Sequence, residues 1–213
     1  MLCTLGAGPH EELLAIVRPT FEAYAARHGY DFVAETESLD DTRPLPWSKI
    51  VLFQRLMRSY ELVLWIDCDA VIIDGSADIA DSLSKKATFG LVAHATPEGP
   101  EIPNTGVVLI RSSRKAQRFL DRVWQRTEYI DHKWWENAAF LELLGYSADP
   151  PVTRVRETRD RKMFLYLDPL WNVLPFQDVE RPRIKHYAGQ TQEARVAGLT
   201  ADVELTKRTI TRQ

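Results

Sequence analysis

The chain has 213 residues, 45% of them hydrophobic and 27% charged, a composition typical of a soluble globular domain that can bury its own core. A formal net charge of -3 gives no electrostatic argument for a nucleic-acid partner, and no stretch reaches the ~20 apolar residues of a membrane-spanning helix. Residues 1–12 lack the basic start and long apolar core of a signal peptide, so we expect a cytoplasmic protein without a transmembrane segment.

The first third of the chain alternates between strand and helix patterns. Residues 1–5 form a short apolar run closed by a Gly-Ala-Gly-Pro loop, and apolar residues at helical spacing then predict a helix around residues 13–24. Pro19 is expected to kink or restart that helix. Residues 30–35 predict a second strand, and a second helix is expected from Trp47 onward. This alternation indicates an α/β fold.

Residues 62–66 are almost continuously apolar, as expected for a central parallel strand buried on both faces. The remaining candidates are strands at 89–93, 107–110, 164–167 and 183–187 and helices at 113–127 and 135–144. The segment after Gly189 is charged and only weakly periodic, so no element is predicted there. Cys3 and Cys68 both fall in apolar runs, which favours small buried side chains over a disulfide.

Two aspartates, Asp67 and Asp69, stand where the apolar run at 62–66 gives way to a loop. The carboxyl ends of strands hold the ligand in open α/β sheets, and two uncompensated carboxylates there would be costly. A divalent cation such as Mn²⁺ or Mg²⁺, bound together with ligand phosphates, removes that cost. The alternative is an acid pair that caps the following turn, and the short pattern alone does not decide between the two.

A phosphatase of the haloacid dehalogenase type, with Asp67 as nucleophile, is another interpretation of the same pattern. Such enzymes carry the acid pair in the first strand of their domain and a second pair of acids late in the chain. Here strand and helix units precede the motif, and the region of Asp160 and Asp168 holds no paired acids. These surroundings disfavour the phosphatase.

Asn104 and His186 are further polar side chains at the ends of apolar runs. Asn104 could hydrogen-bond a sugar hydroxyl, although a tight Asn-Thr-Gly turn is the favoured interpretation. A lone histidine is usually structural. However, a neutral imidazole at the end of the strand at 183–187 could complete a metal site begun by Asp67 and Asp69.

Paired tryptophans precede two polar residues at the start of the predicted helix at 135–144. Glu136 and Asn137 can cap that helix or meet a substrate near its positive end. Trp134 and Trp135 are equally suited to the core and to stacking on a sugar.

Taken in order, these segments resemble the galactosyl- and mannosyltransferases of glycosyltransferase family 34, with features shared with the glycogenin-like family. The matching segments span most of the chain and are YAARHGYDFV, PWSKIVLFQRLM, YELVLWIDCDAVIID, NTGVVLIRSS, WWENAAFLELL, YLDPLWNVLP and KHYAG. The resemblance implies a single-domain GT-A fold, which is Rossmann-like, with a mixed central sheet flanked by helices. Residues 1–95 would form the nucleotide-binding half, 96–190 the acceptor and sugar half, and 191–213 a C-terminal tail.

The resemblance also implies Mn²⁺ or Mg²⁺, a nucleotide-diphosphate sugar as donor, and retention of the anomeric configuration. Asp67 and Asp69 would meet the metal and the diphosphate, His186 would be the third protein ligand, and Lys49 would help to hold the donor. The expected donor site is completed by Thr4, Leu5 and Gly6 near the base, by Asn104 and Gly106 at the sugar, and by Cys68 and Gly189.

The chain departs from the family at two places. The Asp-Gln pair at the donor sugar appears as Glu136-Asn137, and Glu136 would stabilise the oxocarbenium-like centre or act as a nucleophile. Relatives often place a lysine soon after the His-x-x-Gly segment to meet the diphosphate. This chain has Gln190-Thr191-Gln192, so another group or the metal alone must neutralise part of the phosphate charge.

The sequence therefore predicts a metal-dependent glycosyltransferase that moves a hexose or pentose from a UDP- or GDP-sugar to a hydroxyl of a small-molecule or glycan acceptor. The alternatives are the phosphatase and a non-catalytic nucleotide-sugar binding module. The base, the sugar, the acceptor and the oligomeric state are left open.

Overall fold

The computed structural model describes residues 1–96, 99–149, 152–154 and 156–210, and it confirms the predicted α/β class with a mixed central sheet. Six strands pair in the order β2-β1-β3-β6-β5-β7. Their bounds are β1 Leu2–Leu5, β2 Phe32–Glu35, β3 Leu62–Ile66, β5 Phe89–Thr96, β6 Gly99–Arg111 and β7 Phe164–Tyr166. Within this sheet β6 is antiparallel to both of its neighbours, and all the other pairings are parallel.

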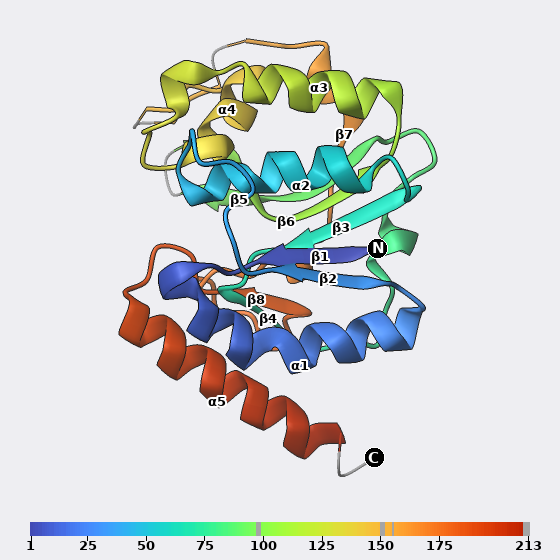
Figure 1. Ribbon diagram of the computed structural model, residues 1–213, viewed down its shortest axis with the longest axis vertical. Coiled ribbons are helices and arrows are strands. Elements are labelled where there is room, and N and C mark those ends of the chain that lie inside the picture. Colours follow the sequence, from blue (N-terminus) through green and yellow to red (C-terminus); the bar gives the residue numbers. More distant parts are fainter. Residues whose placement is uncertain (97–98, 150–151, 155, 211–213) are drawn as a thin grey trace.

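Helices cover both faces of the sheet (Figure 1). One face carries α2 (Ser48–Leu56), α3 (Arg114–Trp124) and α4 (Trp135–Leu143). The other carries α1 (Glu11–His28), α5 (Gln192–Ile210) and a two-stranded sheet of β4 (Ala70–Ile72) and β8 (Ile184–His186). Short 3₁₀ turns lie at Gly8–His10, Leu45–Trp47, Ile79–Ser82, Thr127–Tyr129, Asp160–Met163 and Pro169–Trp171.

The two helical layers explain why β3 has no polar face. Leu64 and Ile66 point into the core shared with α1, whereas Val63 and Trp65 point into the core shared with α2 and α3. Successive side chains of a strand alternate between the faces of its sheet, so a strand covered on both sides must be apolar throughout. The predicted central position of β3 is confirmed, with β1 parallel on one side and β6 antiparallel on the other.

Helix α1 runs unbroken from Glu11 to His28, so the helix does not restart at Pro19, which was one of the two outcomes expected there. A proline inside a helix costs about 3 kcal/mol. Fully buried side chains on both sides of it, Val17 and Phe21 among them, offset this cost by packing against the sheet. The helix ends at Gly29, whose left-handed φ of 68° closes the C-terminus.

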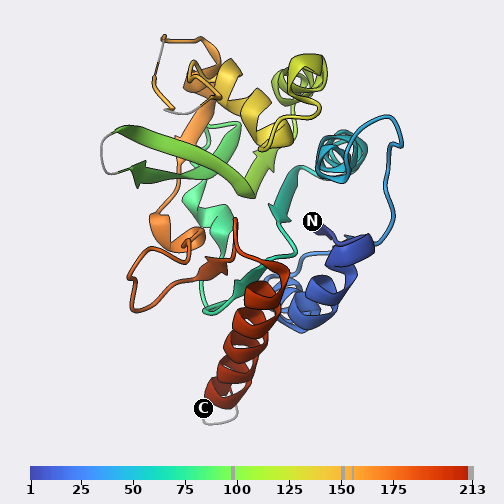
Figure 2. The ribbon, with the colours of Figure 1, turned by 90° about the vertical axis from the view of Figure 1, so that its left-hand side faces the viewer.

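Three elements differ from the sequence-based expectation. Strand β4 was not predicted, and α5, the red helix that leads to the C-terminus in Figure 2, occupies the segment expected to be a weakly periodic C-terminal tail. The predicted tight turn at Asn104 is wrong, because residues 104–106 lie inside β6. A register shift in the β5–β6 pairing, from Leu91↔Val108 to Val92↔Asn104, accommodates these residues within the strand as a bulge.

Cys3 and Cys68 are buried and free, as predicted. Among the described residues, no helix has both the length and the apolar character needed to cross a membrane.

Candidate functional site

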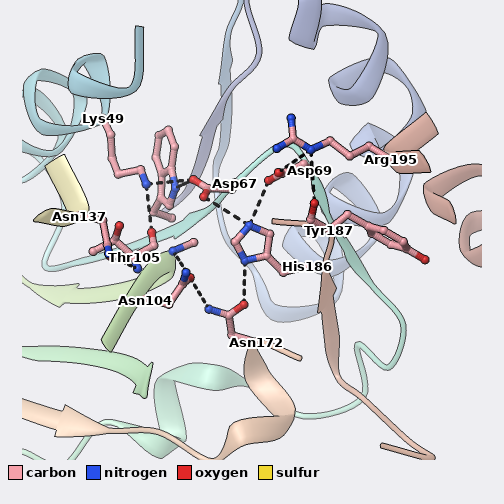
Figure 3. Close-up of polar contacts among 12 residues, drawn as sticks. Lys49, Asp67, Asp69, Asn104, Thr105, Asn137, Asn172, His186, Tyr187 and Arg195 are labelled. Carbon is pink, nitrogen blue, oxygen red and sulfur yellow. Dashed lines mark hydrogen bonds and ion pairs between the residues drawn. The ribbon is translucent and has the colours of Figure 1, made fainter. Parts of the chain in front are cut away.

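The acid pair and His186 meet because β4 follows the aspartates directly. The chain turns after β3, with Ala70 N donating to Asp67 O at 3.0 Å, and β4 then pairs with β8 so that Ala70 lies opposite His186. Tyr187 N donates to Asp69 O at 2.9 Å and extends this pairing. His186 Nε2 consequently lies 3.1 Å from Asp69 Oδ1 and 3.6 Å from Asp67 Oδ2 (Figure 3).

The three predicted metal ligands thus form one cluster. One ligand atom from each of Asp67, Asp69 and His186 lies within 4.8 Å of the other two. Two carboxylate oxygens and one imidazole nitrogen are a donor set that suits Mn²⁺ and related divalent cations. The residues present therefore fit a metal ion.

A chain of hydrogen bonds fixes which nitrogen of His186 carries its proton. Gly106 N, a backbone donor, makes Asn104 Oδ1 an acceptor at 2.8 Å, so Asn172 Nδ2 must be the donor in its 2.9 Å bond to the same oxygen. Asn172 Oδ1 then accepts from His186 Nδ1 at 2.9 Å. In neutral His186 this leaves the lone pair on Nε2, facing the two aspartates, which is the tautomer that a metal ligand requires.

Opposing effects act on the charges of this cluster. Burial alone would raise the pKa of Asp69, but His186 and Arg195 outweigh it and lower that pKa to about 2. Burial also opposes the protonated form of His186, while Asp69 and Asp67 raise its pKa. The imidazole ring and Arg195 are therefore the groups that offset the negative charge of Asp69.

Lys49 is a buried cation that joins three elements. Its Nζ lies 3.0 Å from Asp67 Oδ1, 2.8 Å from Glu136 Oε1 and 3.1 Å from Thr105 O. Burial disfavours the charged ammonium, but Asp67 and Glu136 together raise the pKa of Lys49. An ammonium has three N–H donors, and each of these three contacts takes one.

Glu136 and Asn137 do not cap α4, contrary to one of the two expectations for them. Glu136 is buried on Lys49 and also accepts from Thr105 Oγ1 at 3.3 Å, while Asn137 Oδ1 accepts from Thr105 N at 3.0 Å. Burial raises the pKa of Glu136, an effect that Lys49 opposes. The two residues fasten the β6 bulge to α4 and α2.

Gly106 is required by close packing against His186. A Cβ at this position would lie 2.1 Å from His186 Cε1 and 2.4 Å from Nδ1. The predicted pocket glycine is therefore the surface on which the imidazole ring rests.

These groups line a pocket of about 920 Å³ at the carboxyl end of β3. Of the predicted site residues, it is lined by Leu5, Lys49, Asp67, Cys68, Asp69, Asn104, Gly106, Glu136, Asn137, His186 and Gly189. Burial raises the pKa of Cys68, so its thiol is a neutral part of the wall. Thr4 and Gly6 are not among the lining residues. Thr4 is buried in the sheet, and Gly6 allows β1 to approach α1, since a Cβ there would lie 2.6 Å from Leu14 Cβ.

The paired tryptophans differ in their surroundings. Trp134 packs against the small cluster that contains Leu141 and Leu144, whereas Trp135 is 39% exposed and has a φ of 42°, unusual for a residue other than glycine. Both residues line the pocket.

Sequence reasoning missed four residues of the site: Thr105, Asn172, Arg195 and His94. Asn172 stands in the matching segment YLDPLWNVLP, which was the available signal. Arg195 lies on α5, in the segment predicted as a tail. His94 is buried in β5, and burial together with His186 lowers its pKa to about 4.

Comparison with known proteins confirms the resemblance deduced from the sequence. The family described as galactosyl transferase GMA12/MNN10 matches residues 8–96. An uncharacterized α-1,2-galactosyltransferase of Schizosaccharomyces pombe is 27% identical over 157 residues, which cover 56% of this chain and 40% of the relative. The chain thus matches less than half the length of its curated relatives.

Solved structures share the fold. A glycosyltransferase involved in the glycosylation of the major capsid of PBCV-1 superposes with a TM-score of 0.70 at 19% identity, covering 94% of this chain and 98% of that one. The galactosyltransferase LgtC in complex with donor and acceptor sugar analogues gives 0.63 at 10% identity, covering 97% and 95%. At these identities the likeness identifies the fold, which is the GT-A type.

Proposed function

We propose that this chain is a metal-dependent glycosyltransferase that moves a hexose or pentose from a UDP- or GDP-sugar to a hydroxyl of a small-molecule or glycan acceptor. The observation that carries the proposal is the cluster of Asp67, Asp69 and His186 at the wall of a large pocket, in which Nε2 of His186 faces both carboxylates. The family match and the names of the relatives support the same reaction class.

In this proposal Asp67, Asp69 and His186 hold Mn²⁺ or Mg²⁺, which when bound stabilises the negative charge on the departing nucleoside diphosphate. The two carboxylate oxygens of Asp67 have different surroundings, and Oδ2 is the one placed to bind the metal ion together with His186. Its Oδ1 accepts from Trp65 Nε1 at 2.5 Å and pairs with Lys49, while Oδ2 faces His186.

The transfer breaks the bond between the anomeric carbon and a phosphate oxygen and forms a bond from that carbon to the acceptor oxygen. With retention, the acceptor hydroxyl approaches on the side of the leaving group, and its proton passes to the phosphate oxygen that departs. The products are a glycoside and a nucleoside diphosphate, so this route needs no dedicated protein base.

Glu136 lies across Lys49 from Asp67, and its contacts favour an electrostatic role. Its Oε1 is engaged by Lys49 and Thr105, and the residue is only 4% exposed. A carboxylate held in this way stabilises positive charge that develops on the sugar more readily than it attacks the anomeric carbon. We assign the nucleophile's role to no residue.

A thermal-shift panel of UDP, GDP, UMP and GMP, with and without Mn²⁺, tests the proposal, because a ligand that binds the folded state raises its stability. We expect a shift that requires Mn²⁺ for the wild type and none for Asp69→Asn. Asp121→Asn, on α3 and bonded to Gln54, is the matched control and should behave as the wild type. No shift with any nucleotide would contradict the proposal.

Hydrolysis of the donor separates the enzyme from a binding module. Slow release of sugar from a UDP- or GDP-sugar, dependent on Mn²⁺ and absent in Asp69→Asn, supports the transferase. Tight Mn²⁺-dependent nucleotide binding without turnover of any donor or acceptor would favour the binding module, and release of phosphate from simple esters would favour the phosphatase.

A further inference from the structure

Besides the buried Lys49, the pocket is lined by the partly buried Arg195, and the two cations differ in how many of their N–H donors are already engaged. Lys49 has one contact for each of its three N–H groups, with Asp67, Glu136 and Thr105. It can therefore reach an anionic ligand only by giving up a partner inside the protein. Its contacts connect α2 with the loop after β3, with β6 and with α4.

Arg195 lines the same pocket from the first turn of α5, and its side chain is 19% exposed. Its Nε donates to Tyr187 O at 3.3 Å and lies 3.3 Å from Asp69 Oδ2. Among the residues that the structure describes, Nη1 and Nη2 donate no hydrogen bond, and Nε makes the closest approach of the guanidinium to a carboxylate. In Figure 3 the guanidinium lies over Asp69 with these two nitrogens directed away from α5.

Two features make this guanidinium suited to a phosphate. The contacts of Nε fix the plane of the group, so its remaining N–H donors form a preoriented fork, which is the geometry that binds phosphate oxygens in pairs. The guanidinium also stands beside Asp69, one of the three residues of the metal cluster, where the phosphates of a nucleotide would lie in the proposed function.

The balance of charge in the pocket also favours Arg195 over Lys49 as the group that binds an anion. The single positive charge of Lys49 is balanced by two carboxylates, those of Asp67 and Glu136. Arg195 faces only Asp69 among the acidic residues described. In the proposed function a cation would share Asp69, and Arg195 would then be a positive group available to an anion in this pocket.

We infer that Arg195 binds the diphosphate of the nucleotide, and that α5 is therefore part of the donor site. The inference rests on the proposed function. It identifies the group that neutralises the phosphate charge in a chain that has Gln190-Thr191-Gln192 after its His-x-x-Gly segment.

Calorimetric titrations of Mn²⁺ alone, and of UDP, UMP, GDP and GMP in saturating Mn²⁺, test the inference on the full chain. For Arg195→Gln, the Kd of the preferred diphosphate should rise about 10-fold or more, since hydrogen bonds to charged groups are among the stronger ones. The Kd of the monophosphate should change less than about 3-fold. Arg195→Lys keeps the positive charge but loses the paired N–H donors. Its Kd for the diphosphate should therefore lie between those of the wild type and of Arg195→Gln.

Binding of Mn²⁺ alone distinguishes a phosphate-binding role from a structural one. Removing a positive charge next to Asp69 should leave Mn²⁺ affinity unchanged or increase it, whereas a residue that merely holds Asp69 in place would weaken Mn²⁺ and nucleotide together. Arg18→Gln, on the exposed face of α1, is the matched control and should change neither the affinity for Mn²⁺ nor the affinity for the nucleotides.

Equal diphosphate affinity in Arg195→Gln and the wild type would overturn the inference, as would parallel weakening of Mn²⁺, diphosphate and monophosphate. Failure of the proposed function has a different signature, because the wild type itself would then bind no nucleoside diphosphate in Mn²⁺. Circular dichroism and the thermal midpoint of each variant without ligand establish that it is folded.

Discussion

Lys49 Nζ and Glu136 Oε1 form a 2.8 Å ion pair between α2 and α4, although 87 residues separate them in the sequence. Both side chains are 5% exposed. Removing one partner of a buried pair leaves an uncompensated charge, which typically costs about 3–5 kcal/mol. Lys49 also pairs with Asp67, so the pair belongs to a three-residue network in which the lysine is central.

Lys49→Met should therefore destabilise the protein by about 3–5 kcal/mol, and by more than Glu136→Gln. The lysine variant leaves two carboxylates without a cation, whereas the glutamine keeps an oxygen for Lys49 and removes a charge. Urea unfolding without added metal measures both. An equal loss in the two variants would contradict the central position of Lys49.

Gly106→Ala should displace His186, because the new Cβ would lie 2.1 Å from the imidazole Cε1. We expect Mn²⁺ affinity to fall about 10-fold or more, as happens when a ligand loses its orientation. Gly75→Ala is the control, since its Cβ would meet only Tyr24 Cδ2 at 3.2 Å and Ile72 Cγ2 at 3.7 Å. Mn²⁺ titration by calorimetry compares the two, and unchanged affinity in Gly106→Ala would count against the proposed ligand set.

Most of the fold was predictable because the spacing of apolar residues along single strands and helices indicates it. Strand β3 is apolar on both faces, and α3 carries a regular apolar stripe introduced by Ser113, whose Oγ accepts from Ala116 N at 3.1 Å. Helix α5 was not predicted because only a small part of it is buried, at residues such as Leu199 and Val203, so its apolar pattern is weak. Strand β4 escaped because three residues are too short for a periodic signal.

The candidate site was predictable in its residue types but not in its connections. The position of Asp67 and Asp69 after a buried strand, together with a histidine late in the chain, indicated a metal cluster. The hydrogen bond of Asn172 to His186 and the Arg195 contact with Asp69 depend on β8 and α5 packing against the loop after β3. Such contacts leave no spacing rule in the sequence.

Asn172→Ala should weaken Mn²⁺ binding about 10- to 100-fold, the usual cost of losing the partner that orients a ligating histidine. Asn172 Oδ1 accepts from His186 Nδ1 at 2.9 Å and so keeps the lone pair on Nε2. Nuclear magnetic resonance of the imidazole nitrogens reports the tautomer directly. A variant that binds Mn²⁺ as well as the wild type does would show that His186 needs no such partner.

His94 should make stability depend on pH below neutrality. Burial first, and then the charge of His186, lower the pKa of His94 in the folded protein from 6.5 to about 4. As pH falls from 6.5 to 4, His94 becomes protonated in the unfolded chain but stays neutral in the folded protein. The free energy of unfolding therefore decreases over this range, by at most about 1.4 kcal/mol per pH unit. His94→Gln should flatten the slope between those limits. Urea unfolding at a series of pH values measures this, and an imidazole resonance of folded His94 that titrates near 6.5 would contradict the assignment.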